Sequence, residues 1–209
     1  MSVTRHAAGR GVALAALLAL GGCTSLLVSK PDPLDTFVLT APRVDAQRRS
    51  GRAQLLIAEP LALKDLDSQS VVVRTAPEEV QFLAGAQWSD RLPALVQARL
   101  VEGFQRAGRF GGVGRPGQGL AIDYQILTDI RDLAIVDGPG GRRAHVEIAV
   151  SILDDRNGNI RRQKTFEASV AVAGADNADY VRALDAAFGF VGAVLGALVL
   201  IWAWKTYIR

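Results

Sequence analysis

Three segments in the second half of the chain alternate between apolar and polar residues with a period of two, and they constrain the fold more than any other feature. They cover residues 120–126, 144–152 and 166–172. Clean alternation predicts strands with one buried face and one solvated face. The first two are joined through "DGPGGRR" and the next two through "DRNGN", which has Asn157-Gly158 at the turn. The three segments therefore predict an antiparallel meander.

Shorter apolar segments precede the meander. Strands are expected over residues 36–40, 54–58 and 71–74, and residues 80–85 are expected to extend the last of these after Pro77. A helix over 90–107 and a second helix from Ala178 carry apolar stripes at helical spacing that must cover the apolar face of the sheet. The pattern predicts an α+β fold, an antiparallel β-sheet with two helices packed on one face, in the order strands, helix, three-strand meander, helix.

The ends of the first helix have local signals. Ser89 or Asp90 can cap its beginning, and Pro93 is tolerated because it lies in the first turn. Gly108 follows the last apolar position and predicts the end of the helix.

The N-terminus has the layout of a secretory signal. Residues 1–10 carry two arginines and no acid, and an apolar run over 12–20, too short to span a bilayer, follows. The run ends in a tetrapeptide that looks like a bacterial lipobox: Leu20, Gly21, Gly22 and Cys23. We expect residues 1–22 to be a lipoprotein signal peptide, Cys23 to carry the lipid, and residues 23–35 to be a lipidated tether. The alternative is an ordinary signal with a chance cysteine.

Acylation of Cys23 would also decide where the protein works. A diacylated residue is a stable membrane anchor, because each buried methylene contributes about 0.8 kcal/mol. Thr24 follows the cysteine in place of the aspartate that commonly retains lipoproteins in the inner membrane. We therefore expect a lipid-anchored protein on the periplasmic face of the outer membrane.

The C-terminus allows a second membrane assignment. Ala186 to Trp204 is 19 residues long without a charge, which is the length of a membrane span. Trp202 and Trp204 would lie at an interface, and Gly192 and Gly196 form a G-x-x-x-G face. However, the two preceding turns are amphipathic, and outer-membrane crossings are barrels. A docked core or partner-facing helix is favoured, with an inner-membrane span through Ala186–Trp204 as the alternative.

The sequence offers little for catalysis. His6 leaves with the signal, so His145 is the remaining histidine, on the solvated face of a predicted strand. A G-x-S-x-G elbow is missing from the sequence, and "GGVGRPGQGL" precedes a strand where a phosphate loop would open a helix. Acidic and basic residues are nearly balanced once the signal is removed, which argues against nucleic acid as a partner. We expect no enzyme, cofactor or metal; a hydrolase using His145 is the alternative.

Several segments together resemble a known family. They are "DTFVLTAP", "LLIAEP", the stretch from "VVVRTAPEEV" through Trp88 to Phe110, "AIDYQILTDIRDL" and "ALDAAFG". They are similar to the ABC-type transport auxiliary lipoprotein component family, which includes the lipoprotein of the paraquat-inducible system. The resemblance covers most of the mature chain and predicts one domain over residues 36–200.

The resemblance implies a non-enzymatic periplasmic subunit. Its partners would be an ABC transporter with ATPase, permease and mammalian-cell-entry-domain subunits, and its cargo would be phospholipid moved between two membranes. Docking or receipt of lipid at the outer membrane is the implied role; a periplasmic scaffold lipoprotein is the alternative. Only Cys23 carries over from the family as a functional residue. From the residues themselves, Phe82, Trp88, Trp202 and Trp204 are candidates for lipid or partner contact, although Trp88 could instead pack on the helix it precedes.

Overall fold

The computed structural model describes residues 33–44, 51–119 and 121–207, with side chains up to residue 201. Residues from Leu34 onward form one compact unit. The expected signal peptide, the lipobox and Cys23 lie outside the described residues, so their assignment stays a prediction.

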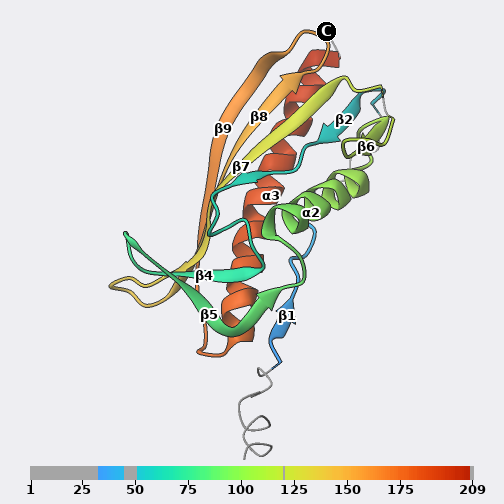
Figure 1. The fold of residues 1–209 in the computed structure, drawn as a ribbon. Coiled ribbons are helices and arrows are strands. Elements are labelled where there is room, and N and C mark those ends of the chain that lie inside the picture. Colours follow the sequence, from blue (N-terminus) through green and yellow to red (C-terminus); the bar gives the residue numbers. More distant parts are fainter. Residues whose placement is uncertain (1–32, 45–50, 120, 208–209) are drawn as a thin grey trace, which may run out of the picture. The chain divides into compact units, whose positions relative to one another are not determined.

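The predicted meander is present and organises the sheet. It consists of β7 (Tyr124–Val136), β8 (Arg143–Asp154) and β9 (Asn159–Ala171), paired antiparallel along their length (Figure 1). Alternate residues of β8, from Ala144 to Ile152, are buried, as the period of two predicts. Gly158 has φ +72° at the β8–β9 turn, which confirms the Asn-Gly turn. The first strand begins at Tyr124, four residues later than expected.

The expectation of a purely antiparallel sheet is wrong, because the far edge of β7 carries three parallel strands. β2 (Gln54–Ile57), β3 (Leu61–Ala62) and β4 (Ser70–Ala76) each pair with a successive part of β7. Parallel neighbours require a long crossover connection. The chain between β4 and β7 contains a helix and supplies that crossover, so the nine-stranded sheet is mixed.

The segment expected to extend the third strand instead turns back on it. β5 (Glu79–Trp88) pairs antiparallel with β4, and Pro77 lies in the turn between them. The short β1 (Asp35–Phe37) adds in parallel to the end of β5, so that Phe37 lies opposite Trp88. At the other edge, the glycine-rich β6 (Gly112–Gly114) pairs with β2. This part of the glycine-rich stretch is therefore an edge strand.

Helix α2 covers residues Leu92–Ala107 and buries the predicted apolar stripe. The predicted cap at Ser89 or Asp90 is wrong: Arg91 occupies the N-cap position and its side chain makes no capping hydrogen bond. The amide of Leu92 instead donates to the carbonyl of Ser68, 3.0 Å away. A tertiary hydrogen bond thus satisfies an amide of the first turn, which a side-chain cap would otherwise do. Gly108 ends the helix with φ +63°, as predicted.

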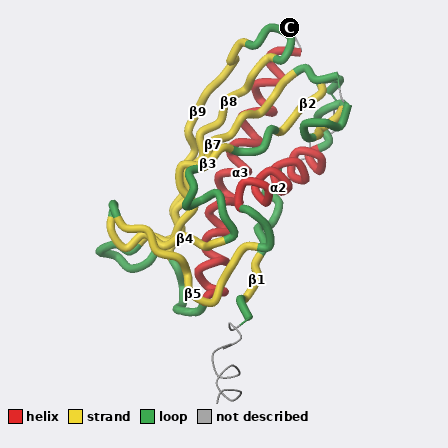
Figure 2. Tube along the Cα trace, viewed as in Figure 1, coloured by secondary structure: helices red, strands yellow, loops and turns green. Residues whose placement is uncertain are grey.

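Helix α3 (Asn177–Tyr207) runs along the meander and contacts β7, β8 and β9 (Figure 2). Leu184, Phe188, Leu195 and Val199 are fully buried between it and the sheet. By length and composition, residues Asn177–Ile201 are also apolar enough to cross a membrane, and half of that window is buried within the structure. In this structure the apolar run packs on the sheet as far as Leu200.

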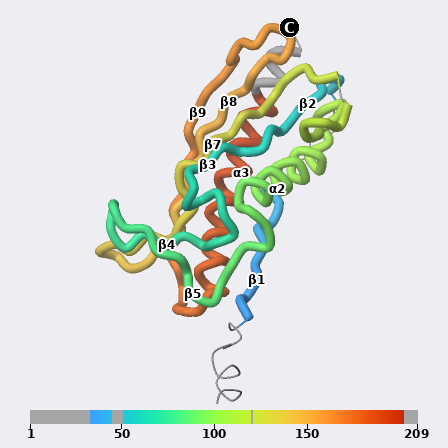
Figure 3. Tube along the Cα trace, viewed as in Figure 1, coloured from blue at the N-terminus to red at the C-terminus, as the bar shows by residue number. Residues whose placement is uncertain are grey.

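The G-x-x-x-G face of α3 is filled by the protein's own N-terminal segment. A methyl group on Gly192 would overlap the ring of Pro42, and one on Gly196 would lie 2.6 Å from a methyl of Val44. Just before this, the Thr40 amide and hydroxyl donate to the two carboxylate oxygens of Asp185, at 2.6 and 2.8 Å. Figure 3 shows this blue segment beside α3. The two glycines therefore accommodate an intramolecular contact.

Candidate functional site: an apolar groove between α3 and the meander

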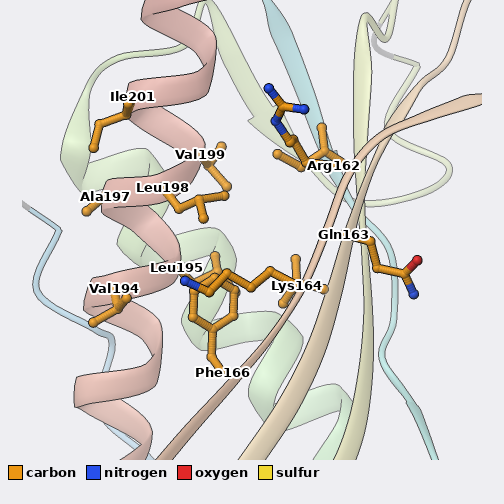
Figure 4. A pocket seen from close by; sticks show the side chains of 12 residues that line it. Arg162, Gln163, Lys164, Phe166, Val194, Leu195, Ala197, Leu198, Val199 and Ile201 are labelled. Carbon is orange, nitrogen blue, oxygen red and sulfur yellow. The ribbon is translucent and has the colours of Figure 1, made fainter.

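A groove of about 520 Å³ lies between the last described turns of α3 and the β8–β9 hairpin (Figure 4). Its size is within the range of about 300–1,000 Å³ that is usual for small-molecule sites. Residues on α3, β8 and β9 line it: Val150, Ile152, Arg162, Gln163, Lys164, Phe166, Val194, Leu195, Ala197, Leu198, Val199 and Ile201. Nine of these twelve are apolar, and none is acidic.

The groove has a closed floor and an open mouth. Val150 and Ile152 of β8 and Leu195 and Val199 of α3 are buried and form the floor. On the helix wall, Val194 is 53% exposed and Ile201 is 59% exposed. Apolar surface in the groove is therefore in contact with solvent, which is unfavourable by about 25 cal/mol for each Å².

The exposed wall continues as a stripe along α3. Ala186, Phe190, Val194, Ala197 and Ile201 are all exposed and follow one another at intervals of three or four residues. Such spacing places them on one side of the helix, opposite the side packed on the sheet. An ordinary surface helix is polar on this side, whereas here both sides are apolar. On its helix side the groove thus opens onto an uncharged surface.

Two cations stand at the mouth of the groove, on β9. Arg162 pairs in register with Ile152, and Lys164 pairs with Val150. Paired residues of antiparallel strands project from the same face, so both cations project from the face that bears the groove floor. The Lys164 ammonium lies 5.3 Å from the ring centroid of Phe166. Within the described chain, neither cation forms a salt bridge.

A distortion in β9 sets the register of these cations. The pairing shifts between Ile152 and Leu153, so that Arg161 is an extra residue of β9, a β-bulge. The Arg161 guanidinium donates to Asp154 Oδ2 at 2.6 Å, and the Arg156 amide donates to Oδ1 at 3.1 Å. The hydrogen bond from Arg161 lowers the pKa of the Asp154 carboxyl, because it stabilises the ionised form. Asp154 thus holds the bulge that precedes Arg162.

The structure does not bring the residues singled out from the sequence together. Trp88 is 1% exposed and lies in the core, so of its two alternatives the structure has the packed one; it pairs with Phe37 and does not offer a contact surface. Phe82 is 54% exposed on β5, away from the residues that line the groove. Trp202 and Trp204 belong to α3, but their side chains lie outside the described part.

Sequence reasoning missed Arg162 and Lys164, although a signal for them exists. The buried face of the third strand was identified from Phe166 onward. The same period of two, extended toward the N-terminus of β9, reaches Lys164 and Arg162. A cation where alternation demands an apolar residue marks the point at which the buried face of β9 becomes exposed to solvent.

A second cavity, of about 450 Å³, lies beside β4, β7 and β8 and includes His145, which is half-buried. Its arginine at β4 is already paired: Arg74 donates to Asp132 at 3.1 Å and to Asp65 at 3.2 Å. Partial burial works to lower the pKa of Arg74, but the two carboxylates outweigh burial and raise it. Among the described residues, no three histidine, cysteine or acidic side chains are arranged to hold a metal ion.

Comparison with known proteins places this fold among described ones. The model of the family described as "ABC-type transport auxiliary lipoprotein component" matches residues 37–193. An uncharacterised protein of Bradyrhizobium diazoefficiens is 32% identical over 136 residues, which are 65% of this chain and 36% of that protein. The chain therefore spans about a third of that relative's length.

Two solved structures share the architecture. The Xanthomonas campestris protein XCC0632 is 23% identical, with a TM-score of 0.74 over 84% of this chain and 100% of that one. The hypothetical protein CT253 of Chlamydia trachomatis is 10% identical, with a TM-score of 0.53 over 73% of this chain and 98% of that one. At these identities the likeness concerns the fold.

Proposed function

The chain belongs to the ABC-type transport auxiliary lipoprotein component family, and from this premise we propose that it is a lipid-anchored subunit that handles phospholipid for an ABC-type intermembrane transport system. Its partners in this proposal are the ATPase, the permease and a mammalian-cell-entry-domain subunit. The protein has no catalytic role and is anchored through Cys23 at the periplasmic face of the outer membrane. The family supports the auxiliary role and the lipoprotein character; the finer assignments are ours.

The groove is the single observation that carries the lipid assignment. An acyl chain is an unbranched apolar segment, and the groove offers it a buried floor with partly exposed walls. Each methylene that moves from water into such a site contributes about 0.8 kcal/mol. Several methylenes therefore suffice for retention of one chain while the rest of the lipid remains free to leave.

The packing of α3 supports a docked rather than a membrane-spanning helix. Leu195 and Val199 are part of the core and also form the groove floor. Insertion of α3 into a bilayer would expose the apolar residues of β8 that these side chains cover. We therefore assign the apolar run of α3 to the folded domain and keep the anchor at Cys23.

A bulky side chain in the groove tests this proposal. Leu198 lines the groove, is half-buried and projects from α3 toward β9 (Figure 4), so Leu198→Trp should fill the groove. The matched control is Ala186→Trp, an exposed alanine on the same helix that does not line the groove. Each full-length protein is purified from envelopes in mild detergent, and co-purifying phospholipid is quantified by mass spectrometry.

We expect the wild type and the Ala186→Trp control to retain phospholipid and the Leu198→Trp variant to lose most of it. Equal retention by all three would contradict the assignment of the groove. A wild-type protein free of lipid, isolated together with an entry-domain protein, would instead favour the scaffold alternative.

A further inference from the structure

The chemistry of the groove mouth goes beyond acyl-chain binding. Among the described residues that line the groove, the charged ones are Arg162 and Lys164, and both are cationic. A ligand with an anionic group next to its apolar segment would meet opposite charge there, whereas an ammonium group would meet like charge. Resting on the proposed function, we propose that the groove selects phospholipids with a net negative headgroup, whose phosphate lies between Arg162 and Lys164.

The neighbouring charges leave these two cations available. Arg161, the adjacent residue, is engaged by Asp154, as described above. Lys164 contacts the face of the Phe166 ring, which holds the ammonium over the apolar floor without neutralising it. A phosphate accepts hydrogen bonds from guanidinium and ammonium groups, and such charge-assisted contacts are stronger than neutral ones. The mouth can therefore bind one anion without breaking an internal ion pair.

Headgroup selection follows from what else the mouth contains. Phosphatidylethanolamine and phosphatidylglycerol share the phosphate, but the first also carries an ammonium. Among the described residues that line the groove, no carboxylate is present to pair with that ammonium. Phosphatidylglycerol has no such unpaired charge, so it should bind more tightly.

Edge protection is the competing explanation for both cations. Among the described strands, β9 pairs with β8 alone and is an edge strand of the sheet. Charged residues that point inward from an edge strand hinder pairing with another molecule. If this were their sole role, neutral substitutes would cause association of the protein and would leave lipid preference unchanged.

A lipid competition experiment distinguishes these explanations. Full-length protein in a neutral detergent is incubated with equal amounts of phosphatidylglycerol and phosphatidylethanolamine that carry identical acyl chains. Native mass spectrometry then gives the ratio of the two bound lipids and the oligomeric state. The test variant is Arg162→Gln with Lys164→Gln. The control, Arg52→Gln with Lys64→Gln, removes the same charge from exposed positions that do not line the groove.

We expect the wild type and the control to favour phosphatidylglycerol by about fivefold to tenfold, as two solvent-exposed charge contacts allow, with the preference falling at high salt. The test variant should bind both lipids nearly equally. Equal binding of both lipids by the wild type would overturn the headgroup inference and leave the acyl-chain site intact. Binding of neither lipid would refute the proposed function itself. A test variant that associates yet keeps the preference would support edge protection and overturn the inference.

Discussion

Asp154 illustrates how one side chain can organise a site that it does not line. It accepts hydrogen bonds from the Arg161 guanidinium and from the Arg156 amide, at the bulge where β9 begins to face the groove. Its side chain is 9% exposed, so these contacts are largely shielded from water. The carboxylate thereby ties the β8–β9 turn to the strand that carries Arg162.

The lowered pKa of Asp154 predicts a pH dependence of stability. In the folded protein, the hydrogen bond from Arg161 lowers the pKa of the Asp154 carboxyl below its ordinary value of 3.8. A depressed pKa stabilises the fold fully above the ordinary value, and this contribution disappears as the pH falls through the folded-state pKa. In urea unfolding, Asp154→Asn should be less stable than the wild type at pH 7, and the difference should shrink below about pH 4.

Asp129→Asn is the matched control for this measurement. The Asp129 side chain is 53% exposed, and its charge partner, Arg131, lies 3.9 Å away. We expect this variant to follow the wild type at both pH values. A difference between Asp154→Asn and the wild type that is constant from pH 7 to pH 3 would show that the charge of Asp154 does not provide the stability.

At the scale of elements, the close contact between α3 and the N-terminal segment leaves no room for a side chain at Gly192 or Gly196. An added methyl on Gly192 meets the rigid ring of Pro42, whereas one on Gly189 meets nothing within 4 Å. Gly192→Ala should therefore lower the free energy of unfolding by about 1–3 kcal/mol through overpacking. Gly189→Ala, one turn earlier, should be neutral or stabilising by up to about 1 kcal/mol, because alanine favours helix.

Chemical denaturation of the two full-length variants in the same detergent measures both effects. If Gly192→Ala were as stable as Gly189→Ala, the N-terminal segment would not be packed against α3 as the structure has it. Equal loss of stability in both variants would point to helix packing in general and would also contradict the assignment.

The sequence predicts an element well when its determinants lie within its own segment and poorly when they lie in distant parts of the chain. The meander and both helices were predicted because their apolar periodicity is local to each segment, and Gly108 and Asn157-Gly158 mark their ends with local conformations. The parallel pairing of β2, β3 and β4 with β7 could not be predicted, since it depends on which strands meet across the crossover. The predicted cap of α2 was wrong for the same reason: the carbonyl of Ser68, which accepts the hydrogen bond in place of a side-chain cap, is distant in sequence.

For the candidate site, the sequence predicted the apolar character of α3 but not that the charged part of β9 lies beside it. Lys164 and Arg162 can be recognised as groove residues only when β9 is placed against α3, because their own segment has the pattern of an ordinary charged strand. For Trp88 the sequence left two alternatives open, a contact surface or packing against the helix it precedes, and the structure buries it.

At the scale of the whole molecule, docking of α3 predicts the location of the C-terminus. If the apolar run stays on the sheet, Arg209 lies on the same side of the membrane as the folded domain. Alkaline phosphatase fused after Arg209 should then be active, and green fluorescent protein exported by the same route and fused there should remain dark. Inverse results for the two fusions would show that α3 crosses the inner membrane.

The contact between Thr40 and Asp185 has a mechanical consequence. An acylated tether would join the folded domain at Leu34. A few residues later, Thr40 is hydrogen-bonded to α3, and Pro42 and Val44 pack against the glycines of that helix. Tension between membrane and domain would therefore be borne first by the pairing of β1 with β5 and then by α3, the helix that forms one wall of the groove. A pull that separated β1 from β5 would next load the helix that lines the groove.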